Sequence, residues 1–293
     1  MYRLMVIWAM LVGVAAFSLY QSEEKADLRV GMLKTVDTIH PLIARDLGYY
    51  EDEGLSVSVH TFGTSPALAE AIAAGEIDVA YMSVVPAAIW KAKGTDITML
   101  AGASRGGDMV CTRDGRTSGS IAISNKGTFT QTLYDYYVED KFDYQPVYGI
   151  EPADMPTALL VTKDVDAAFV WEPFASAIEK AGGTCIFDTG GEWKSERGTK
   201  YQRNVLVASG KASEDPLLVQ KLLRINERTI AFLNSPGSEA AVAKAMKIEP
   251  LTEKRVEYNS SIDWDSMVAL WGHAKENGYL AKIPEKSEIL YGG

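Results

Sequence analysis

Cysteine and histidine are scarce in this sequence, and the few that it has are spread apart. Its 293 residues include only Cys111, Cys185, His40, His60 and His273. There is no Cys-x-x-Cys pair and no histidine cluster, so neither a zinc site nor a haem attachment can be read from the sequence. We therefore predict no metal and no cofactor. The two cysteines could pair in an oxidising compartment, but the sequence favours two separate small core residues.

The chain also lacks a cluster of lysine and arginine. It has 29 basic and 39 acidic residues, with a formal net charge of −10. Binding to phosphate backbones needs a basic face, so nucleic acid is excluded as a partner. A hydrophobic content of 47% with 23% charged residues is typical of a globular protein, and the length suits two domains.

A run without charge stands near the beginning of the sequence. Residues 4–20 are uncharged, follow Arg3, and precede the polar stretch "QSEEK". Small residues at 14–16 offer a signal-peptidase site. We expect residues 1–27 to be a signal peptide or an N-terminal anchor, which makes the protein extracytoplasmic and, if uncleaved, membrane-associated. The cysteine that would mark a lipoprotein is missing from the end of this run.

Short apolar strands alternate with helices from Leu28 onward, and this order occurs twice. The first copy has strands near Val30, Val57 and Val79, and the second has strands near residues 121, 147 and 167. Alternation of this kind predicts parallel strands joined by crossover helices. The helix after the second strand, "SPALAEAIAAGE", is expected to begin with Ser65 as N-cap.

The two copies also match locally. "GEIDVAYMSVVPA" at 75–87 aligns with "KDVDAAFVWEPFA" at 163–175. Two copies of one unit imply two similar lobes. After one more strand, "RNVLVAS", we expect only helices, including one over "TEKRVEYNSS". We therefore predict a first lobe of residues 28–104 plus 205–293, a second lobe of 105–204, and a hinge of two crossing strands.

The sequence resembles the solute-binding proteins of ABC importers. Within them it is similar to the family for sulfonates, taurine, nitrate and thiamine-pyrimidine precursors. The resemblance spans nearly all of residues 28–290 and rests on "HPLIARDLGYYEDEGLSVSVHTFGTSPALAEAIAAGEIDVAYMSVVPAAIWKAKG" (40–94), "IAISNKGTFTQTLYDYY" (121–137), "VDAAFVWEPF" (165–174) and, more weakly, "ENGYLAKIP" (276–284). It implies a type II periplasmic-binding fold, an α/β architecture of two Rossmann-like lobes. It also implies capture of a small ligand between the lobes and delivery to an ABC transporter permease. The sequence departs from the family pattern in a shorter stretch at 105–118.

Candidate ligand-binding residues follow the predicted strands, whose carboxyl ends should meet at one cleft. Helix N-termini there suit an anionic group, although their Ser and Thr could simply cap the helices. Arg105 could bind a sulfonate or carboxylate, Glu172 could pair with a ligand amine, and Trp171 could stack on a ring or cation. Arg105 could equally be a solvated hinge residue, and Trp171 and Glu172 could be structural. The full set is Asp37, Thr38, His40, Gly63, Thr64, Ser65, Ser83, Val84, Arg105, Gly127, Thr128, Phe129, Thr130, Trp171 and Glu172.

The sequence leaves the ligand open between a small organic anion or zwitterion and a pyrimidine. An enzyme is a weaker interpretation. "GASRG" at 102–106 matches the Gly-x-Ser-x-Gly elbow of serine hydrolases, but that motif needs a helix directly after the serine. A pyrimidine-precursor synthase shares the fold but depends on a cysteine cluster that this chain lacks. A membrane-tethered sensor is a minor alternative. We therefore predict a binding protein without catalytic residues.

Overall fold

The computed structural model describes Ala26 and residues 28–293. The predicted signal or anchor segment, residues 1–27, lies outside the described residues except for Ala26. Within the described part of the chain, no helix combines the length and apolar character needed to cross a bilayer.

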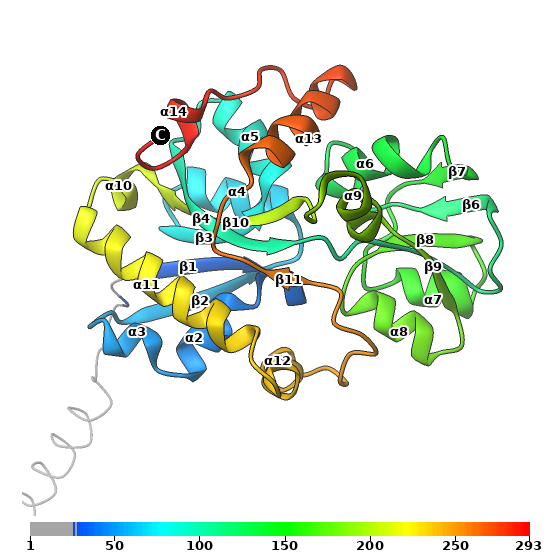
Figure 1. Ribbon diagram of the computed structural model, residues 1–293, viewed down its shortest axis with the longest axis horizontal. Helices are drawn as coiled ribbons and strands as arrows, with labels where there is room; N and C mark the ends of the chain where they lie inside the picture. Colours follow the sequence, from blue (N-terminus) through cyan, green and yellow to red (C-terminus); the bar gives the residue numbers. More distant parts are fainter. Residues whose placement is uncertain (1–25, 27) are drawn as a thin grey trace, which may run out of the picture.

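Six strands form the first sheet, in the spatial order β11-β4-β10-β3-β1-β2 (Figure 1). In chain order they are β1 (Leu28–Leu33), β2 (Val57–Phe62), β3 (Val79–Ser83), β4 (Ile97–Arg105), β10 (Gln202–Ser209) and β11 (Glu257–Tyr258). Strand β1 is parallel to β2 and β3, whereas β10 is antiparallel to β3 and β4. We call this sheet and the helices on it the first lobe.

Five strands form the second sheet, in the order β7-β6-β8-β5-β9. They are β5 (Met109–Thr112), β6 (Ser118–Ala122), β7 (Asp143–Val147), β8 (Ala167–Val170) and β9 (Thr184–Asp188). Strand β6 is parallel to β7 and β8, and β5 is antiparallel to β8 and β9. This sheet and its helices form the second lobe, so the predicted α/β architecture with two sheets is confirmed. The exact lobe boundaries at 104/105 and 204/205 stay a prediction.

Parallel pairing holds only inside the two repeated units. Strands β5 and β10 each enter a sheet from the other lobe, without the crossover helix that parallel neighbours require, and both run antiparallel to their partners. The predicted parallel pairing is therefore confirmed within the two repeats, and both sheets are mixed because β5 and β10 join them in the antiparallel sense.

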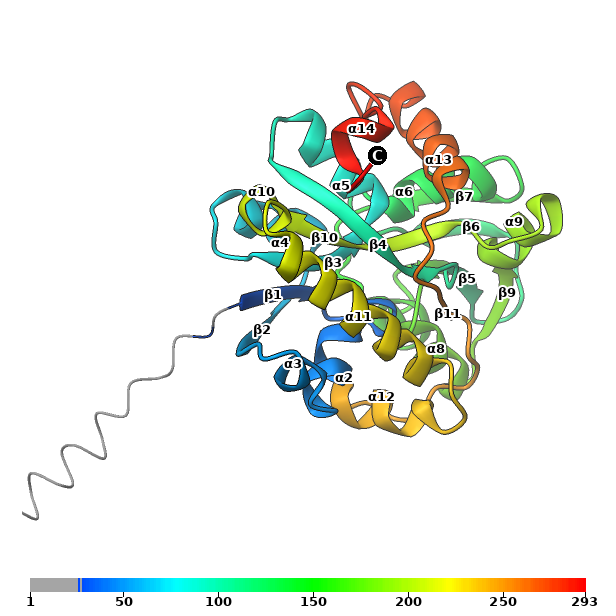
Figure 2. The same cartoon turned by 60° about the vertical axis from the view of Figure 1, so that its left-hand side comes forward.

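Helices cover both faces of each sheet (Figures 1 and 2). The first lobe carries η1 (Val36–Thr38), α2 (His40–Asp46), α3 (Tyr49–Asp52), α4 (Ser65–Ala73), α5 (Val84–Ala92), α10 (Gly210–Ser213), α11 (Pro216–Leu233), α12 (Ser238–Met246), α13 (Trp264–Glu276) and α14 (Lys286–Ile289). The second carries α6 (Phe129–Leu133), a π-helical turn η2 (Tyr134–Val138), α7 (Met155–Leu160), α8 (Phe174–Lys180) and α9 (Thr189–Arg197).

Local capping explains where two of these helices begin. Asp215 caps α11 by accepting hydrogen bonds from the amides of Leu217 and Leu218, and Pro216 occupies the first turn. In α4 the N-cap is Thr64 rather than the predicted Ser65, which shifts that helix start by one residue. The helix expected over 252–261 was also wrong, because this stretch is not helical and supplies the short strand β11 at the edge of the first sheet.

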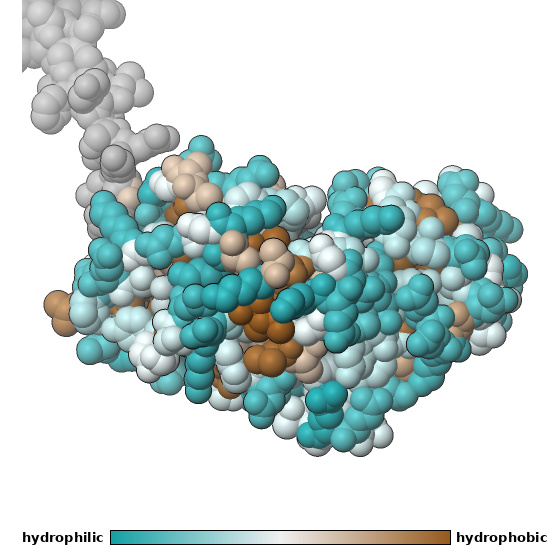
Figure 3. All heavy atoms as spheres, turned by 90° about the horizontal axis from the view of Figure 1, so that it is seen from above, coloured by the Kyte–Doolittle hydropathy of each residue, from teal (hydrophilic) through white to brown (hydrophobic). Residues whose placement is uncertain are grey.

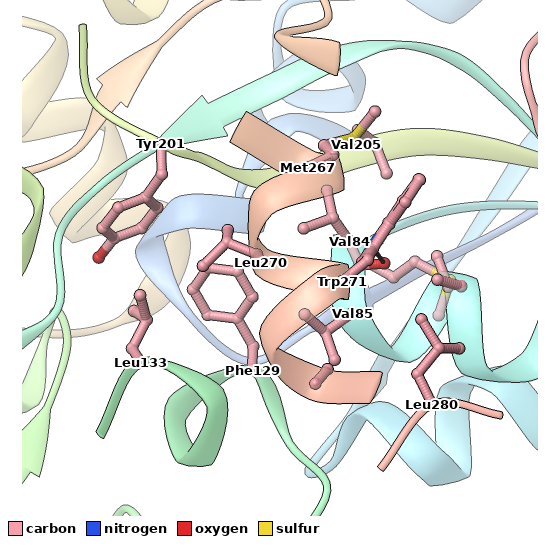
Figure 4. Close-up of a cluster of buried hydrophobic side chains, with 14 of the residues drawn as sticks. Val84, Val85, Phe129, Leu133, Tyr201, Val205, Met267, Leu270, Trp271 and Leu280 are labelled. Carbon is pink, nitrogen blue, oxygen red and sulfur yellow. Dashed lines mark hydrogen bonds between the residues drawn. The ribbon is translucent and has the colours of Figure 1, made fainter. Parts of the chain in front are cut away.

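One hydrophobic cluster joins the two lobes (Figure 4). Leu270 and Trp271 of α13 belong to it together with Val84 of α5 in the first lobe and with Phe129 and Leu133 of α6 in the second. The indole Nε1 of Trp271 donates to the backbone oxygen of Val84 at 3.0 Å. The lobes thus meet through buried apolar side chains.

Seen from above, hydrophilic residues cover most of the visible surface, and hydrophobic residues show mainly near the middle of the molecule (Figure 3).

A disulfide between Cys111 and Cys185 links β5 to β9. The two cysteines face each other in the register of this antiparallel pair, so the side chains meet across the ladder. The preference for two separate cysteines was therefore wrong. Sequence separation could not reveal the pairing, because the two strands are 74 residues apart.

We predict that reduction of this disulfide lowers the free energy of unfolding. Closing a loop of 74 residues removes chain entropy from the unfolded state, an effect of about 4 kcal/mol. Denaturant titrations with and without a thiol reductant measure the difference. The double variant Cys111→Ala with Cys185→Ala is the control, because it should be insensitive to the reductant. Equal stability of the oxidised and reduced wild-type protein would contradict the prediction.

Candidate functional site

A cleft lies between the two lobes at the carboxyl ends of β1, β3 and β8. This is the edge where open α/β sheets bind ligands. Both lobes contribute to its wall. The lining residues are Leu33, Thr35, Asp37, Gly63, Thr64, Ser65, Pro66, Ser83, Ser124, Asn125, Thr128, Phe129, Thr130, Glu151, Pro152, Trp171 and Arg203.

Arg203 is part of this lining, and it was not predicted from the sequence. Its guanidinium is buried, its Nε donates to Oδ2 of Asp37, and its second nitrogen lies 3.0 Å from Oδ1 of Asp108. The guanidinium carbon lies 5.1 Å from the ring centre of Phe129 and 5.2 Å from that of Trp171. One cation thus contacts two carboxylates and two aromatic rings. A signal was present, since Arg203 is the single charged residue in the strand "QRNVLVAS".

The charges of this cluster influence one another. Burial of Asp108 raises the pKa of its carboxyl to about 7, although the Arg203 charge and a 2.8 Å hydrogen bond from the Tyr201 hydroxyl act in the opposite direction. Burial opposes the charge of Arg203, but Asp108 and Asp37 outweigh it and hold the pKa of the guanidinium above its ordinary value. Arg203 therefore stays charged and holds Asp37 at the cleft.

Asn204 fixes Asp37 from a second side. Its Nδ2 donates to Oδ2 of Asp37 at 2.9 Å and to the hydroxyl of Ser104 at 2.9 Å, and its Oδ1 accepts from Ser83 at 3.0 Å. Ser104 is fully buried inside β4, which runs on to Arg105 and continues through two glycines into β5. The Gly-x-Ser-x-Gly match is therefore part of a strand and does not form a nucleophile elbow.

The structure brings nine of the fifteen predicted residues into the cleft lining. These are Asp37, Gly63, Thr64, Ser65, Ser83, Thr128, Phe129, Thr130 and Trp171. Thr64 and Thr128 are N-caps of α4 and α6, and their hydroxyls accept hydrogen bonds from Ala67 at 3.4 Å and Gln131 at 3.2 Å. These two residues thus cap their helices and also border the cleft.

Four predicted residues lie beside or behind this lining. The hydroxyl of Thr38 donates to the backbone of Leu33 at 2.9 Å. His40 is buried and stacks on Tyr81 with ring centres 4.6 Å apart. Val84 packs in the interlobe cluster, and Gly127 forms the turn before α6 with a φ of 72°. Thr38, His40 and Val84 make contacts within the protein, because the first residues of a helix point in several directions and only some of them face the strand ends.

Arg105 also lies away from the cleft. Its guanidinium donates to the hydroxyl of Ser261 at 2.9 Å, and the residue borders a separate hollow together with Trp193 and Arg197. Strand β4 carries Arg105 past the strand ends that form the cleft, since it is the longest strand of the first sheet. The structure thus gives Arg105 a contact within the first lobe.

Glu172 is buried, and its carboxylate is paired inside the protein. The guanidinium of Arg255 lies 2.5 Å from Oε1 of Glu172 and 2.7 Å and 2.8 Å from the two carboxylate oxygens of Glu179. Nearby, the hydroxyls of Ser176 and Thr252 are 3.0 Å apart. Glu172, Ser176 and Glu179 belong to the second lobe, while Thr252 and Arg255 lie on the segment from α12 to β11. We call this contact the interlobe latch; it occupies the carboxylate that the sequence had suggested for a ligand amine.

Among the described residues, no group of three or more His, Cys, Asp or Glu side chains could hold a metal ion. The chemistry of the cleft is therefore that of hydrogen bonds, one shared guanidinium and aromatic faces. Such an arrangement can hold a small polar solute by desolvated, paired contacts.

Comparisons with known proteins show what this chain is similar to in sequence and fold. The sequence profile of the NMT1-like family matches residues 21–247. A relative from Brucella abortus, named as a candidate binding protein, is 25% identical over 259 residues, which cover 83% of this chain and 79% of the relative. The solved structure of the periplasmic aliphatic sulphonate binding protein SsuA from Escherichia coli has a TM-score of 0.70 at 19% identity and covers 90% of this chain and 97% of that one.

A second solved structure, the periplasmic nitrate-binding protein NrtA from Synechocystis PCC 6803, has a TM-score of 0.72 at 13% identity. The match covers 90% of this chain and 85% of that one. At these identities the structures establish the fold alone. They confirm the predicted periplasmic-binding-protein fold of two α/β lobes.

We predict that the interlobe latch stabilises the protein through Arg255. Arg255→Ala leaves the buried carboxylate of Glu172 without its counterion, a change that typically costs about 3–5 kcal/mol. Denaturant unfolding measures the loss, and adding Glu172→Gln to the same chain should recover part of it. The matched control is Arg224→Ala, which removes an exposed ion pair with Glu53 and should change the free energy of unfolding by about 1 kcal/mol or less. Equal losses in the two arginine variants would argue against the latch.

We also predict that His40 makes the fold sensitive to acid. Burial lowers the pKa of its imidazole to about 3, whereas the unfolded chain binds a proton near pH 6.5. The neutral His40 side chain therefore contributes to the free energy of unfolding in full above about pH 6.5, and this contribution is lost as the pH falls towards about 3. When the pH falls from about 7.5 to about 5, the free energy of unfolding of the wild type should drop by about 2 kcal/mol more than that of His40→Phe. Unfolding titrations at the two pH values measure this, and parallel pH profiles of the two proteins would refute it.

Proposed function

The chain belongs to the NMT1-like family, and we propose that it is the extracytoplasmic solute-binding component of an ABC importer. In this role it captures a small molecule between its lobes and delivers it to a permease. The observation that carries the proposal is the cleft itself, since residues of both lobes line it at the carboxyl ends of their strands. A ligand that contacts both walls favours the conformation in which the lobes are together.

The names of the structural relatives support this class of function. SsuA is a binding protein for aliphatic sulphonates and NrtA is one for nitrate, and both share the fold of this chain at low identity. We propose a small organic anion or zwitterion as the ligand, such as a sulfonate, taurine or nitrate. A pyrimidine is the second candidate, because the rings of Trp171 and Phe129 both border the cleft and could stack on a flat ring.

A location outside the cytoplasm belongs to the same proposal. It is supported by the uncharged run at residues 4–20 in the sequence and by the disulfide between Cys111 and Cys185, a bond that persists in oxidising compartments. Activity as a binding protein also fits the position of Ser104, whose hydroxyl is buried in a strand and hydrogen-bonded to Asn204.

We predict that a small solute raises the melting temperature without being consumed. A ligand at about 100 times its Kd adds about 2.7 kcal/mol of stability, which amounts to several degrees for a chain of this length. Thermal shift assays with taurine, alkanesulfonates, nitrate and hydroxymethyl-pyrimidine make the measurement. Trp171→Ala should weaken the binding of any hit about tenfold or more, or about 1.4 kcal/mol.

The control for this experiment is Leu217→Ala, an exposed residue on α11 that should leave the affinity unchanged. The absence of a stabilising solute across the panel would overturn the proposed ligand class. An unchanged affinity of Trp171→Ala would remove this ring from the site.

A further inference from the structure

Two residues of the cleft indicate what the ligand must offer. We propose that Asp37 and Trp171 select a solute that carries an N–H donor next to a hydrogen-bond acceptor, that is, a zwitterion with an ammonium group or an aminopyrimidine. A bare inorganic anion or a sulfonate without a nitrogen donor would be a poor ligand. This inference rests on the proposed function and narrows the substrate class of the same cleft.

Asp37 offers a carboxylate oxygen that receives no hydrogen bond from the described residues. Its Oδ2 receives hydrogen bonds from Arg203 and Asn204, whereas its Oδ1 is buried without a hydrogen-bond partner among the described residues. The residue is 2% exposed and lines the cleft. A buried carboxylate oxygen that accepts nothing is costly. A nitrogen donor on the ligand would satisfy it, and an anion would face it with like charge.

Trp171 offers a hydrogen-bond donor that has no acceptor among the described residues. Its indole Nε1 is buried and finds no acceptor within the described part of the chain. Indole Nε1 can only donate, so the matching ligand atom must be an acceptor. Trp171 lines the cleft as well. The ligand therefore needs a donor for Asp37 and an acceptor for Trp171.

These two groups approach the cleft from opposite lobes at one place. Asp37 belongs to η1 of the first lobe, and Trp171 directly follows β8 of the second. The neighbouring residues touch across the gap, since the amide of Val36 donates to the backbone oxygen of Glu172 at 3.4 Å. In this proposal, a compact ligand with adjacent donor and acceptor bonds to both groups and connects the lobes as they close over it.

The charge of the lining supports the same conclusion. Among the described residues that border the cleft, the charged ones are Asp37, Glu151 and Arg203. Arg203 already contacts both Asp37 and Asp108, so an anion would have to compete with two buried carboxylates for it. A ligand cation instead adds a second positive charge beside Asp37, which lowers the energy of the cluster. The acidic end of a zwitterion could lie against the N-terminus of α4, where Ser65 borders the cleft.

Calorimetry with matched pairs of solutes tests this selection. Taurine is compared with isethionate, in which a hydroxyl replaces the ammonium group, and 4-aminopyrimidine is compared with pyrimidine. Nitrate alone is the third probe. For at least one pair we expect the member with the nitrogen donor to bind about tenfold tighter or more, a difference of about 1.4 kcal/mol, and nitrate to give no binding heat.

Two variants then assign the preference to the residues. Asp37→Asn should abolish most of the difference within that pair, because the amide no longer offers a carboxylate to the ligand. Trp171→Phe keeps an aromatic ring at this position and removes the Nε1 donor, so it should weaken binding of the preferred member about tenfold. If Asp37→Asn does not fold, owing to its contact with Arg203, Trp171→Phe alone decides. Asp52→Asn, at an exposed residue paired with Arg228, is the control for charge removal elsewhere.

The outcomes separate the two proposals. Equal affinity within every pair that binds, tight binding of nitrate, or wild-type affinity of Trp171→Phe would overturn the selection by Asp37 and Trp171 while leaving a solute-binding protein. Failure of every probe in both the calorimetric and thermal shift panels would overturn the proposed ligand class and this inference together.

Discussion

The ion cluster of Arg203 with Asp37 and Asp108 is the interaction on which the site depends. Arg203 lies on β10, which belongs to the first sheet, and Asp108 lies on the segment that leads into the second. One guanidinium therefore orients the carboxylate of Asp37 at the cleft and binds the crossing segment at the same time. Because all three groups are buried, loss of one partner would leave the others uncompensated. The position of the cleft wall and the path of the chain between the lobes are thus linked through one side chain.

Much of the fold could be predicted because it is encoded locally. Alternating strands and helices, the repeat of 75–87 at 163–175, and the cap at Asp215 all depend on residues close together in the sequence. Strand direction in the hinge could not be predicted in this way, because it depends on which sheet a strand joins after crossing. The disulfide between Cys111 and Cys185 could not be predicted for the same reason, since the two cysteines come to face each other only when β9 pairs with β5.

Part of the cleft lining was predictable, because residues at the carboxyl ends of strands meet there. Ser83 ends β3, Trp171 directly follows β8 and Asp37 lies shortly after β1, and all three border the cleft. Glu172 follows a strand too, but Arg255 binds its carboxylate from a segment 83 residues away. Arg203 was missed for the converse reason: it lies at the start of a strand that runs antiparallel and therefore presents its beginning, not its end, at the cleft.

The bond between Cys111 and Cys185 has a consequence for the integrity of the chain. It joins the first strand of the second lobe to the last one, so that nearly the whole second sheet lies within a covalent ring. A protease that cuts a loop inside this ring opens it without dividing the molecule, and both flanks stay attached to the first lobe. The chain can therefore survive a single cut between these two cysteines as one covalent unit.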